Sequence, residues 1–250
     1  MKPASLPQPI RAEVEKPFSE KLERAKQLVR VFAKRDGAFV SCSFGKDSTV
    51  VLWLCLKENP DITVVFNNTG VEFPETLELK ERLKAEWRLN LVETKPRRSF
   101  WQVAEEHGLD FGRKYRDACC DALKDAPTRE VVGKLGLKFN FTGLTALESR
   151  VRMWRLCGSG ESYYSRKDGV WRIHPIAYWT PEEVWRFIRE NSLPVNSAYE
   201  KYGLERVGCM FCTSHVGCQK QVSRVNRKAY SLIQERFFRQ KLLDAWVAHK

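Results

Sequence analysis

The sequence predicts an α/β fold with a parallel sheet, followed by a cysteine-rich helical C-terminal extension. Strand-like apolar runs alternate with segments of helical periodicity through residues 18–176, as expected for a series of βαβ units. Beyond this region the alternation stops, and residues 177–250 carry a Cys-x-x-Cys pair and a long helical pattern. Residues 1–17 are Pro-rich and show no periodicity, so we expect them to form an N-terminal arm.

The individual elements follow from local apolar patterns and helix start signals. Strands are expected at residues 38–42, 62–66, 90–93 and 139–143, and helices at 19–32, 49–56, 74–87, 101–106 and about 222–248. A further helix begins at Thr180, where Thr-Pro-Glu-Glu combines an N-cap residue, a first-position proline and first-turn acids. The glycine-containing residues 153–172 are expected to form a lid-like loop.

The composition of the 250 residues is that of a globular protein, with 43% hydrophobic residues. No run approaches the ~20 apolar residues of a membrane helix, and the first residues lack the apolar segment of a secretory signal. We therefore expect a cytoplasmic protein without a membrane partner. The expected compartment is reducing, so its eight cysteines indicate metal binding or chemistry more than disulfides.

The net charge of +12 predicts an anionic partner. Residues 213–250 hold eight lysines and arginines against two acids, which makes the expected C-terminal helix basic. Such a helix is suited to bind DNA or RNA. A solvated helix face that keeps the protein soluble explains the same charges equally well.

A short polar turn between the first strand and its helix has the composition of a phosphate-binding loop. Gly45 permits close approach of an anion, and the amide groups that begin the following helix point toward it. Ser43 and Ser48 offer hydroxyl donors, and Lys46 offers a positive charge. Asp47 would repel phosphate unless Mg²⁺ lies between them, so the turn predicts a metal–nucleotide complex.

This turn resembles the PP-loop, Ser-Gly-Gly-x-Asp-Ser, of enzymes that attack the α-phosphorus of ATP. Phe44 replaces the first glycine of that pattern and removes one flexible position. The resemblance implies an adenine nucleotide alpha-hydrolase-like, Rossmann-like domain that binds ATP through residues 43–48. Ligands of such sheets lie at the carboxyl ends of the strands, where the turns at 43–48, 67–73 and 142–152 are all expected.

Four further segments resemble the phosphoadenosine-phosphosulfate (PAPS) reductase family and occur in the family's order. They are residues 67–76 with a Thr-Gly turn, 119–127 with Cys-Cys-x-x-x-Lys-x-x-Pro, 174–185 with Pro-Ile-x-x-Trp-Thr, and 208–213 with Gly-Cys-x-x-Cys-Thr. The resemblance covers roughly residues 38–213. It implies that Asn68, Thr69 and Gly70 line the nucleotide pocket.

The clustered cysteines are compatible with zinc, with a redox pair or with a [4Fe–4S] cluster. The side chains of two adjacent cysteines converge poorly on one small tetrahedral ion such as zinc. In a larger iron–sulfur cluster, each of the two cysteines can bind a different iron. Cluster-bearing members of the PAPS reductase family hold [4Fe–4S] at the matching positions. The resemblance therefore implies that Cys119, Cys120, Cys209 and Cys212 are ligands, with Lys124 tuning the cluster's charge.

The arginine loop departs from the family. Reductases of the family carry Gly-x-Arg-Arg-x-Gln-Ser-x-x-Arg. The corresponding residues 143–152 of this chain are Gly-Leu-Thr-Ala-Leu-Glu-Ser-Arg-Val-Arg. Gly143, Ser149 and Arg152 keep the pattern and are expected to bind nucleotide, and Arg150 partly replaces the lost arginines. The loss of two guanidinium groups weakens recognition of a sulfonucleotide with a 3′-phosphate.

A second departure concerns the C-terminal Glu-Cys-Gly-Leu-His of the reductases, because no cysteine follows Cys218 here. Both departures resemble ATP pyrophosphatases that support sulfur insertion into nucleic acids, such as those of DNA phosphorothioation. That resemblance implies adenylation of a substrate oxygen, loss of pyrophosphate and displacement of AMP by sulfur. Lys46, Asp47 and Arg152 are the expected catalytic residues, with a persulfide on Cys157 or Cys218 as one way to hold the sulfur.

The expected partners are a cysteine desulfurase or another sulfur donor, and a homodimer is compatible with the sequence. The first alternative function is PAPS or adenylyl-sulfate reduction to sulfite, and the second is a non-catalytic, cluster-bearing binding subunit. Five tryptophans are expected to anchor the core or its loops rather than to stack on bases: Trp87, Trp101, Trp154, Trp171 and Trp185. His174 is expected to be structural.

Overall fold

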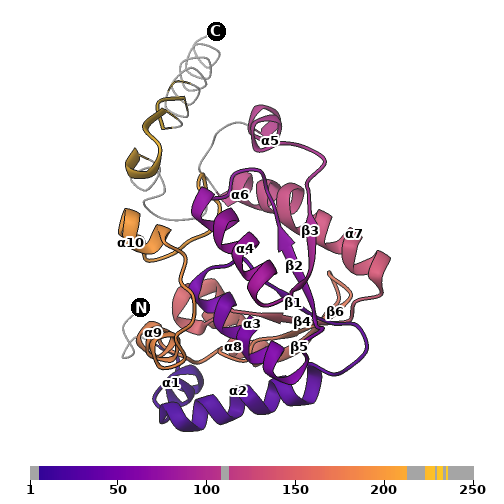
Figure 1. Cartoon of the computed structure of the whole chain (residues 1–250), viewed down its shortest axis with the longest axis vertical. Helices are drawn as coiled ribbons and strands as arrows, with labels where there is room; N and C mark the ends of the chain where they lie inside the picture. Colours follow the sequence, from indigo (N-terminus) through magenta and orange to yellow (C-terminus); the bar gives the residue numbers. More distant parts are fainter. Residues whose placement is uncertain (1–5, 108–112, 213–222, 229, 233–234, 236–250) are drawn as a thin grey trace. The chain divides into compact units, whose positions relative to one another are not determined.

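The computed structural model describes residues 6–107, 113–212, 223–228, 230–232 and 235 (Figure 1). The strands are β1 (Ala38–Ser41), β2 (Thr63–Asn67), β3 (Asn90–Thr94), β4 (Phe139–Thr142), β5 (Ser162–Ser165) and β6 (Val170–Ile173). The α-helices are α1 (Gln8–Val14), α2 (Phe18–Phe32), α3 (Lys46–Glu58), α4 (Pro74–Glu86), α5 (Phe100–His107), α6 (Arg113–Cys120), α7 (Ala126–Leu135), α8 (Arg150–Ser159), α9 (Pro181–Glu190) and α10 (Ala198–Tyr202). A π-helical turn η2 (Asp121–Asp125) joins α6 to α7, and a 3₁₀ turn η3 (Ala146–Glu148) precedes α8.

The six strands form one mostly parallel sheet in the order β3-β2-β1-β4-β6-β5. β1 pairs in parallel with β2 and β4, and β4 pairs in parallel with β6. β5 is the exception, because it pairs antiparallel with β6 at the sheet's edge. The predicted α/β, Rossmann-like class is therefore confirmed, and the loops after β1 and β4 leave the sheet at the same carboxyl edge.

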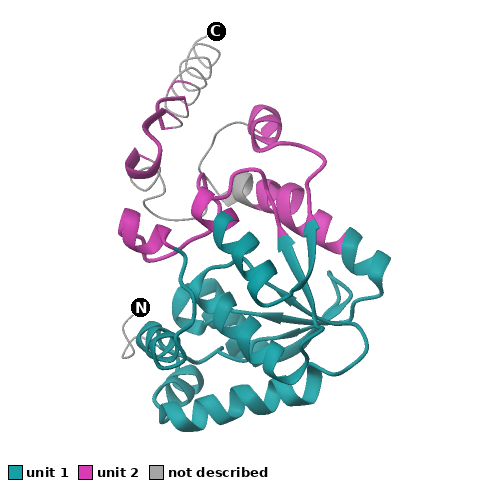
Figure 2. Ribbon diagram, viewed as in Figure 1, with its two compact units in different colours: residues 1–66, 78–93, 130–196 teal, residues 67–77, 94–129, 197–250 magenta. Residues whose placement is uncertain are grey.

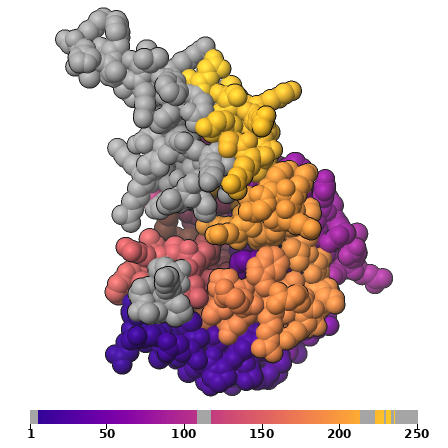
Figure 3. Space-filling model, turned by 90° about the vertical axis from the view of Figure 1, so that its left-hand side faces the viewer, coloured from indigo at the N-terminus to yellow at the C-terminus, as the bar shows by residue number. Residues whose placement is uncertain are grey.

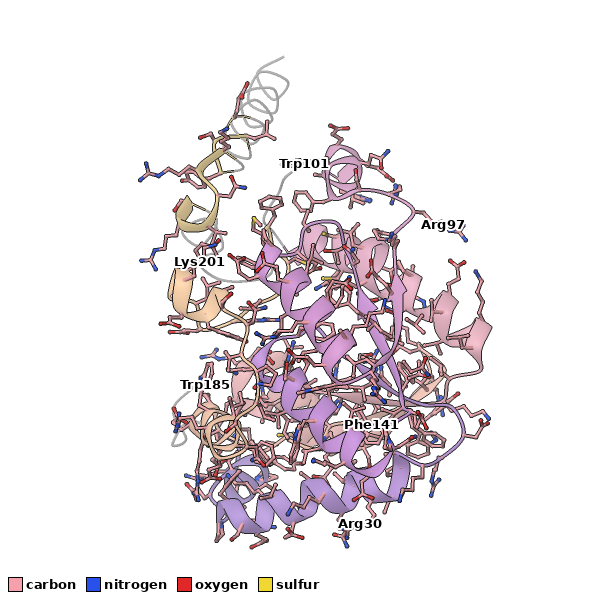
Figure 4. All side chains as sticks on the ribbon, viewed as in Figure 1. Arg30, Arg97, Trp101, Phe141, Trp185 and Lys201 are labelled. Atoms are coloured by element: carbon pink, nitrogen blue, oxygen red, sulfur yellow. The ribbon has the colours of Figure 1, made fainter. Side chains whose placement is uncertain are left out.

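The centre of the sheet is apolar on both faces, as expected for buried parallel strands. Phe39 and Val40 of β1 are fully buried, and so is Phe141 of β4, which is labelled in Figure 4. One face packs on α7, where Val132 joins Phe39 in an apolar cluster. Neighbouring helices α3 and α9 pack on each other, and Trp53 meets Phe187 edge-on at 5.5 Å.

Helix α9 starts as its sequence predicts. The Thr180 side chain accepts a hydrogen bond from the Glu183 amide, and the Glu183 carboxylate accepts one from the Thr180 amide. This reciprocal capping box satisfies two amide groups that a helix start otherwise leaves without partners. Glu183 also forms a 2.7 Å ion pair with the buried Lys21 of α2, which ties the start of α9 to the N-terminal helices.

The N-terminal segment is more structured than the predicted arm. Residues 8–14 form α1, and Ile10 and Val14 are buried. They join Met153 and Leu156 of α8 in one apolar cluster. The sequence pattern missed this helix because it is only seven residues long and its prolines obscure the period.

The predicted lid-like loop at residues 153–172 is wrong. This stretch contains most of α8, the hairpin strand β5 and the start of β6, which joins the central sheet. Its glycines lie between elements, since Gly160 and Gly169 take the positive φ values of 69° that end the helix and close the hairpin turn. Glycine content alone was therefore a poor guide to mobility.

Two compact units divide the chain (Figure 2). Unit 1 comprises residues 1–66, 78–93 and 130–196, and unit 2 comprises residues 67–77, 94–129 and 197–250. Unit 1 holds the sheet and the predicted phosphate loop, whereas unit 2 holds the four predicted cluster cysteines. Among the described residues, no helix is long and apolar enough to cross a membrane.

Candidate nucleotide site and cysteine site

The predicted phosphate loop connects β1 to α3 in unit 1. Ser48 organises it: its hydroxyl donates to the Gly45 carbonyl at 3.0 Å and accepts from the Ser43 amide at 3.3 Å. Gly45 is the N-cap of α3, and the first amides of this helix have no acceptor within the helix; such amides are the donors with which helix N-termini bind anions. The local geometry is that of an anion cradle at a helix N-terminus.

Phe44 takes a backbone conformation that glycine adopts without strain. Its φ is 54°, in the left-handed region, and its side chain is fully buried 5.4 Å from the Phe66 ring. Left-handed backbone costs a residue with a side chain about 1–2 kcal/mol, and burial of the aromatic ring offsets that cost.

Gly143 packs directly on the phosphate loop. A Cβ at this position would lie 2.6 Å from the Asp47 carbonyl carbon and 2.6 Å from the Ser48 amide nitrogen. No side chain fits in that space, so only glycine lets the loop after β4 touch the first turn of α3. The structure thus brings together the two predicted segments of unit 1, residues 43–48 and Gly143.

Lys46 and Asp47 form an ion pair within the loop, with Nζ 2.6 Å from Oδ2. Both side chains are largely buried, and the positive charge of Lys46 also contributes to the lowered pKa of Glu182, after that residue's own backbone and Thr180 hydrogen bonds. A cation and an anion side by side are suited to a phosphate–metal complex, because each can engage one component. The side-chain amide of the fully buried Asn196 donates a hydrogen bond to the Phe44 carbonyl at 3.5 Å and so helps to hold the loop in place.

The arginine loop follows β4 and begins α8. Ser149 is the N-cap of α8, and its hydroxyl accepts from the Arg152 amide at 3.3 Å. The Arg152 guanidinium is paired with Glu148, one helical turn earlier. Arg150 is the first residue of α8 and is exposed. These predicted nucleotide-binding residues therefore lie in one turn at the carboxyl edge of the sheet.

Of the two cysteines predicted to carry sulfur, only Cys157 lies within the described residues. Cys157 of α8 is partly buried and packs against the apolar cluster of α1 and α8. That environment is typical of a packing residue rather than of a reactive thiol, which favours nearby cations and solvent. Cys218 lies outside the described residues, and so does most of the predicted basic C-terminal helix.

Unit 2 contains the predicted Asn-Thr-Gly turn after β2. The Asn68 side chain accepts from the Gly70 amide at 3.1 Å, and Gly70 takes a φ of 78°. Thr69 is buried, and its hydroxyl donates to the Glu72 carboxylate at 2.7 Å. The turn is thus closed by its own side chains.

The same turn meets the Cys-x-x-Cys segment. Glu72 and Cys209 form an antiparallel bridge, and the Met210 amide donates to the Val71 carbonyl at 2.8 Å. The Cys209 sulfur lies 3.4 Å from the Thr69 hydroxyl and 3.9 Å from the Glu72 carboxylate. Sequence reasoning did not assign Glu72 to a site, although it directly precedes the Phe-Pro-Glu segment used for the resemblance.

The Cys-Cys pair ends α6 and enters the same apolar surroundings. Cys119 and Cys209 both pack against a cluster that includes Phe100 and Leu123. Trp101, which is labelled in Figure 4, and Phe211 pack against the same cluster, with their ring centroids 5.9 Å apart. The π-helical turn that follows Cys120 carries Lys124. Such turns are rare and are frequent at functional sites.

Electrostatics couples the four cysteines to each other. Burial, followed by the negative charges of Cys120, Cys209 and Cys212, raises the pKa of Cys119 to about 12. Lys124 opposes this effect: its own pKa is raised, first by the charge of Cys209. Burial also raises the pKa of Cys120 and of Cys209, so as free thiols Cys119, Cys120 and Cys209 stay protonated, and a bound cation is what would stabilise them as thiolates.

The fit to a metal cluster is one of donor chemistry. Four thiols in an apolar, aromatic surrounding with one lysine are the donor set that iron–sulfur clusters use. Among the described residues, however, no group of three or more His, Cys, Asp or Glu side chains is gathered at metal-binding distances. The same holds for the predicted Mg²⁺, whose proposed ligand Asp47 is paired with Lys46.

The exposure of the tryptophans and the contacts of His174 bear on the roles that the sequence predicts for them. Trp154 is 62% exposed and Trp171 is 40% exposed, so neither anchors the core as expected. His174 is structural in its contacts: its Nδ1 lies 2.7 Å from the Thr142 hydroxyl. Burial, then the charge of Arg172, lowers the pKa of His174 to about 3, so it stays neutral.

Comparison with known proteins identifies the family that the sheet, the phosphate loop and the cysteine segments suggest. The sequence profile of the phosphoadenosine phosphosulfate reductase domain matches residues 37–215, and the chain belongs to this family. An adenosine 5′-phosphosulfate reductase of Geobacillus sp. (strain WCH70) is 30% identical over 184 residues, which cover 72% of this chain and 74% of the relative.

Two solved structures share the fold. The phosphoadenylyl-sulfate reductase of Candida auris has a TM-score of 0.60 and 20% identity, covering 77% of this chain and 93% of its own. The U34-tRNA thiolase NcsA of Methanococcus maripaludis, solved with its [4Fe–4S] cluster, has a TM-score of 0.53 and 16% identity, covering 89% of this chain and 79% of its own. At these identities the likeness supports the fold alone.

Proposed function

We propose that this protein binds ATP at residues 43–48, cleaves it to AMP and pyrophosphate, and activates a substrate oxygen for sulfur transfer. The anion cradle at the start of α3 supports the nucleotide assignment, because Gly45, Ser48 and the close approach of Gly143 arrange backbone amides around one point. Membership of the PAPS reductase family supports an adenine nucleotide as the ligand.

The observation that carries the choice of ATP is the burial of Thr145 and Ala146. Reductases of the family have two arginines at these positions. Here Thr145 is 7% exposed and Ala146 is fully buried in the apolar cluster of α1 and α8. The side chains of Thr145 and Ala146 are therefore part of the core. This segment offers no guanidinium group that could bind the additional phosphate or the sulfate of a sulfonucleotide.

The proposed chemistry is positioning and charge stabilisation. The amides of α3 hold the phosphates, Lys46 neutralises charge that develops on the departing pyrophosphate, and Asp47 holds the Mg²⁺ that accompanies ATP. Arg152, beside the loop after β4, stabilises the α-phosphate. The substrate oxygen attacks this phosphorus and pyrophosphate leaves. Sulfide then displaces AMP, an exchange that is redox-neutral; sulfur delivered as a persulfide would in addition need two electrons from a thiol co-reductant.

The four cysteines of unit 2 would hold a [4Fe–4S] cluster. When bound, such a cluster, with each of its four irons held by one of these cysteines, would supply an electron-transfer or electrostatic centre. Lys124 would balance its negative charge, and the aromatic residues around Cys209 would exclude water. A cysteine desulfurase or another sulfur donor is the protein partner that this proposal requires, and a nucleic acid is the proposed acceptor.

A second candidate function is adenylyl-sulfate reduction to sulfite, because the curated relative with 30% identity is named an adenosine 5′-phosphosulfate reductase. Adenylyl sulfate lacks the 3′-phosphate of PAPS, so the missing arginines count less against it. The two candidates use the same phosphate loop and differ in the bond that breaks: α–β phosphoanhydride in ATP, or sulfur–oxygen in the sulfonucleotide.

One paired assay separates them. Protein prepared under anaerobic conditions is mixed with Mg–ATP and sulfide in one arm, and with adenylyl sulfate or PAPS plus thioredoxin in the other. We expect AMP and pyrophosphate in the first arm and no sulfite in the second. Sulfite at a rate above the ATP reaction would overturn the preference for ATP, and no turnover in either arm would favour a cluster-bearing binding subunit.

A matched pair of lysine variants locates the reaction. Lys46→Ala removes the loop cation, and we expect pyrophosphate release to fall by about two orders of magnitude or more. Lys57→Ala, in the last turn of the same helix, removes an exposed lysine whose Nζ lies 4.9 Å from the Trp53 ring. The control should keep full activity, and equal loss in both variants would show that α3 is merely destabilised.

A further inference from the structure

Helix α8 exposes a stripe that its neighbours leave open. Val151, Trp154, Arg155 and Gly158 are all exposed and follow the i, i+3, i+4, i+7 spacing of one helix face. Trp154 is 62% exposed and Val151 is 53% exposed. We call these four residues the α8 face. The helix is held from the other side, where Met153 and Leu156 are buried in the cluster with α1.

The charge of this helix is one-sided. Residues 150–159 contain Arg150, Arg152 and Arg155 and no acidic residue. Arg152 is paired with Glu148. Within the described part of the chain, no ion pair to a carboxylate is found for Arg155, and its side chain is exposed, as is that of the preceding residue, Trp154.

The position of α8 places this face at the edge where the nucleotide is proposed to bind. Seven residues separate the end of β4, at the carboxyl edge, from the start of the helix, and β5 then starts at Ser162, which pairs with Ile173 at the carboxyl end of β6. Both ends of α8 thus meet the edge from which the phosphate loop leaves β1, since Ser41 and Thr142 pair there. The charges of Arg152 and Arg155 also reach His174, just after β6.

The space-filling view shows that the chain around residue 150, coloured salmon, forms part of the surface above the indigo N-terminal helices (Figure 3). A large aromatic ring that is well exposed next to a cation is unusual for a surface without a ligand, because a buried position would stabilise the fold more. An aromatic ring for stacking and an arginine for phosphate are the two groups with which proteins bind single-stranded nucleic acid.

We propose that the α8 face binds single-stranded nucleic acid, with a base stacked on Trp154 and a backbone phosphate on Arg155. The proposal rests on the proposed function and extends it, because it names the class of sulfur acceptor and the surface that presents it. Val151 widens the apolar platform, and the exposed Gly158 leaves the strand room to pass along the helix. The net charge of +12 favours approach of a polyanion to the whole chain.

The test measures binding without turnover. Fluorescence anisotropy of a labelled single-stranded oligonucleotide of about 16 nucleotides is recorded with the full chain, in the absence of ATP. We expect Trp154→Ala to weaken binding about tenfold, as for the loss of one stacked base. Arg155→Glu should weaken binding comparably and reduce its dependence on salt. Because both side chains are exposed, neither variant should change the thermal unfolding temperature.

Two controls make the result specific. Trp171 is also exposed, but it pairs with Phe139, the first residue of β4, and so lies at the opposite edge of the sheet. Arg30 of α2 is exposed and near Glu58. Trp171→Ala and Arg30→Glu should both change affinity by less than about twofold. Ultraviolet cross-linking should attach the oligonucleotide to the peptide that contains Trp154.

The outcomes are separable. Full affinity in Trp154→Ala, equal losses in the controls, or no binding by the wild-type chain would each overturn the α8 proposal. A chain that releases pyrophosphate but binds no oligonucleotide contradicts this inference alone. A chain that binds through Trp154 but releases no pyrophosphate, and whose Lys46→Ala variant binds equally well, contradicts the proposed function alone.

Discussion

The phosphate loop of unit 1 and the cysteine segments of unit 2 are built in opposite ways. The phosphate loop is one short stretch, residues 43–48, that is held by backbone contacts with Gly143 and by Ser48. The cysteine site combines three segments distant in sequence, residues 69–72, 119–124 and 209–212, through one β-bridge and a network of charges. The first depends on steric fit and the second on electrostatic balance.

This difference predicts how each region fails. The fold of a steric site should be disrupted by an added methyl group, and its stability should be insensitive to the removal of a nearby charge, even where activity needs that charge. An electrostatic site should tolerate small changes of volume and should lose stability when its cation is removed. The four predictions below test this contrast, from the largest expected effect to the smallest.

Gly143→Ala should have the largest effect, because its Cβ would lie 2.6 Å from backbone atoms of Asp47 and Ser48. We expect the loop to be displaced, with a loss of about 3 kcal/mol in the free energy of unfolding and of detectable ATP binding by calorimetry. Gly158→Ala is the matched control: no atom lies within 4 Å of its Cβ, so α8 should gain stability by up to about 1 kcal/mol.

Lys124→Met should destabilise the cysteine site by electrostatics at nearly constant volume. The Glu72 carboxylate and Cys209 would lose the cation that faces them, and we expect a cost of about 2–3 kcal/mol in denaturant unfolding. Lys134→Met removes an exposed lysine of α7 that pairs with Glu130 at 2.7 Å, and it should cost less than about 0.5 kcal/mol. Equal effects would argue against an electrostatic site.

His174 gives a pH-dependent test in unit 1. Its folded pKa is lowered to about 3 from 6.5, so below pH 6.5 the unfolded chain takes up a proton that the folded chain refuses. Its contribution to stability is therefore present above pH 6.5 and is lost as the pH falls toward 3, by about 2 kcal/mol at pH 5. His174→Gln should remove this part of the acid sensitivity, which unfolding curves at pH 8 and pH 5 would measure.

Phe44 gives the smallest predicted difference. Both Phe44→Ala and Phe44→Gly should be less stable than the wild type, because the ring against Phe66 is lost. Glycine should be more stable than alanine by about 1 kcal/mol, since only glycine takes a φ of 54° without strain. Alanine equal to glycine in thermal unfolding would mean that the backbone relaxes away from this conformation.

The contrast also explains how far the sequence could predict the molecule. The phosphate loop could be nominated from the sequence because residues 43–48 are contiguous and lie between a strand and a helix with clear periods, whereas its contact with Gly143 depends on a distant segment. The cysteine ligands were nominated from a family pattern, but Glu72 and the bridge to Cys209 depend on pairing between distant segments, which no local pattern encodes. The π-helical turn after Cys120 has no sequence period of its own.

The errors had physical causes as well. Helix α1 is short, and its burial comes from contacts with α8 that are distant in sequence. Residues 153–172 were taken as a lid because glycines there mark helix and hairpin ends, and the same signals occur in loops. Trp154 was expected to anchor the core or a loop because large aromatic side chains are usually buried, and its 62% exposure is what made the α8 face visible.

The most direct test of the central claim measures two properties of one variant. Lys46→Ala, purified anaerobically beside the wild type, is assayed for pyrophosphate release from ATP and for the visible absorbance of an iron–sulfur cluster. The account predicts that pyrophosphate release is lost while the absorbance is unchanged, because the two sites lie in different units. Loss of both properties, or full activity in the variant, would contradict it.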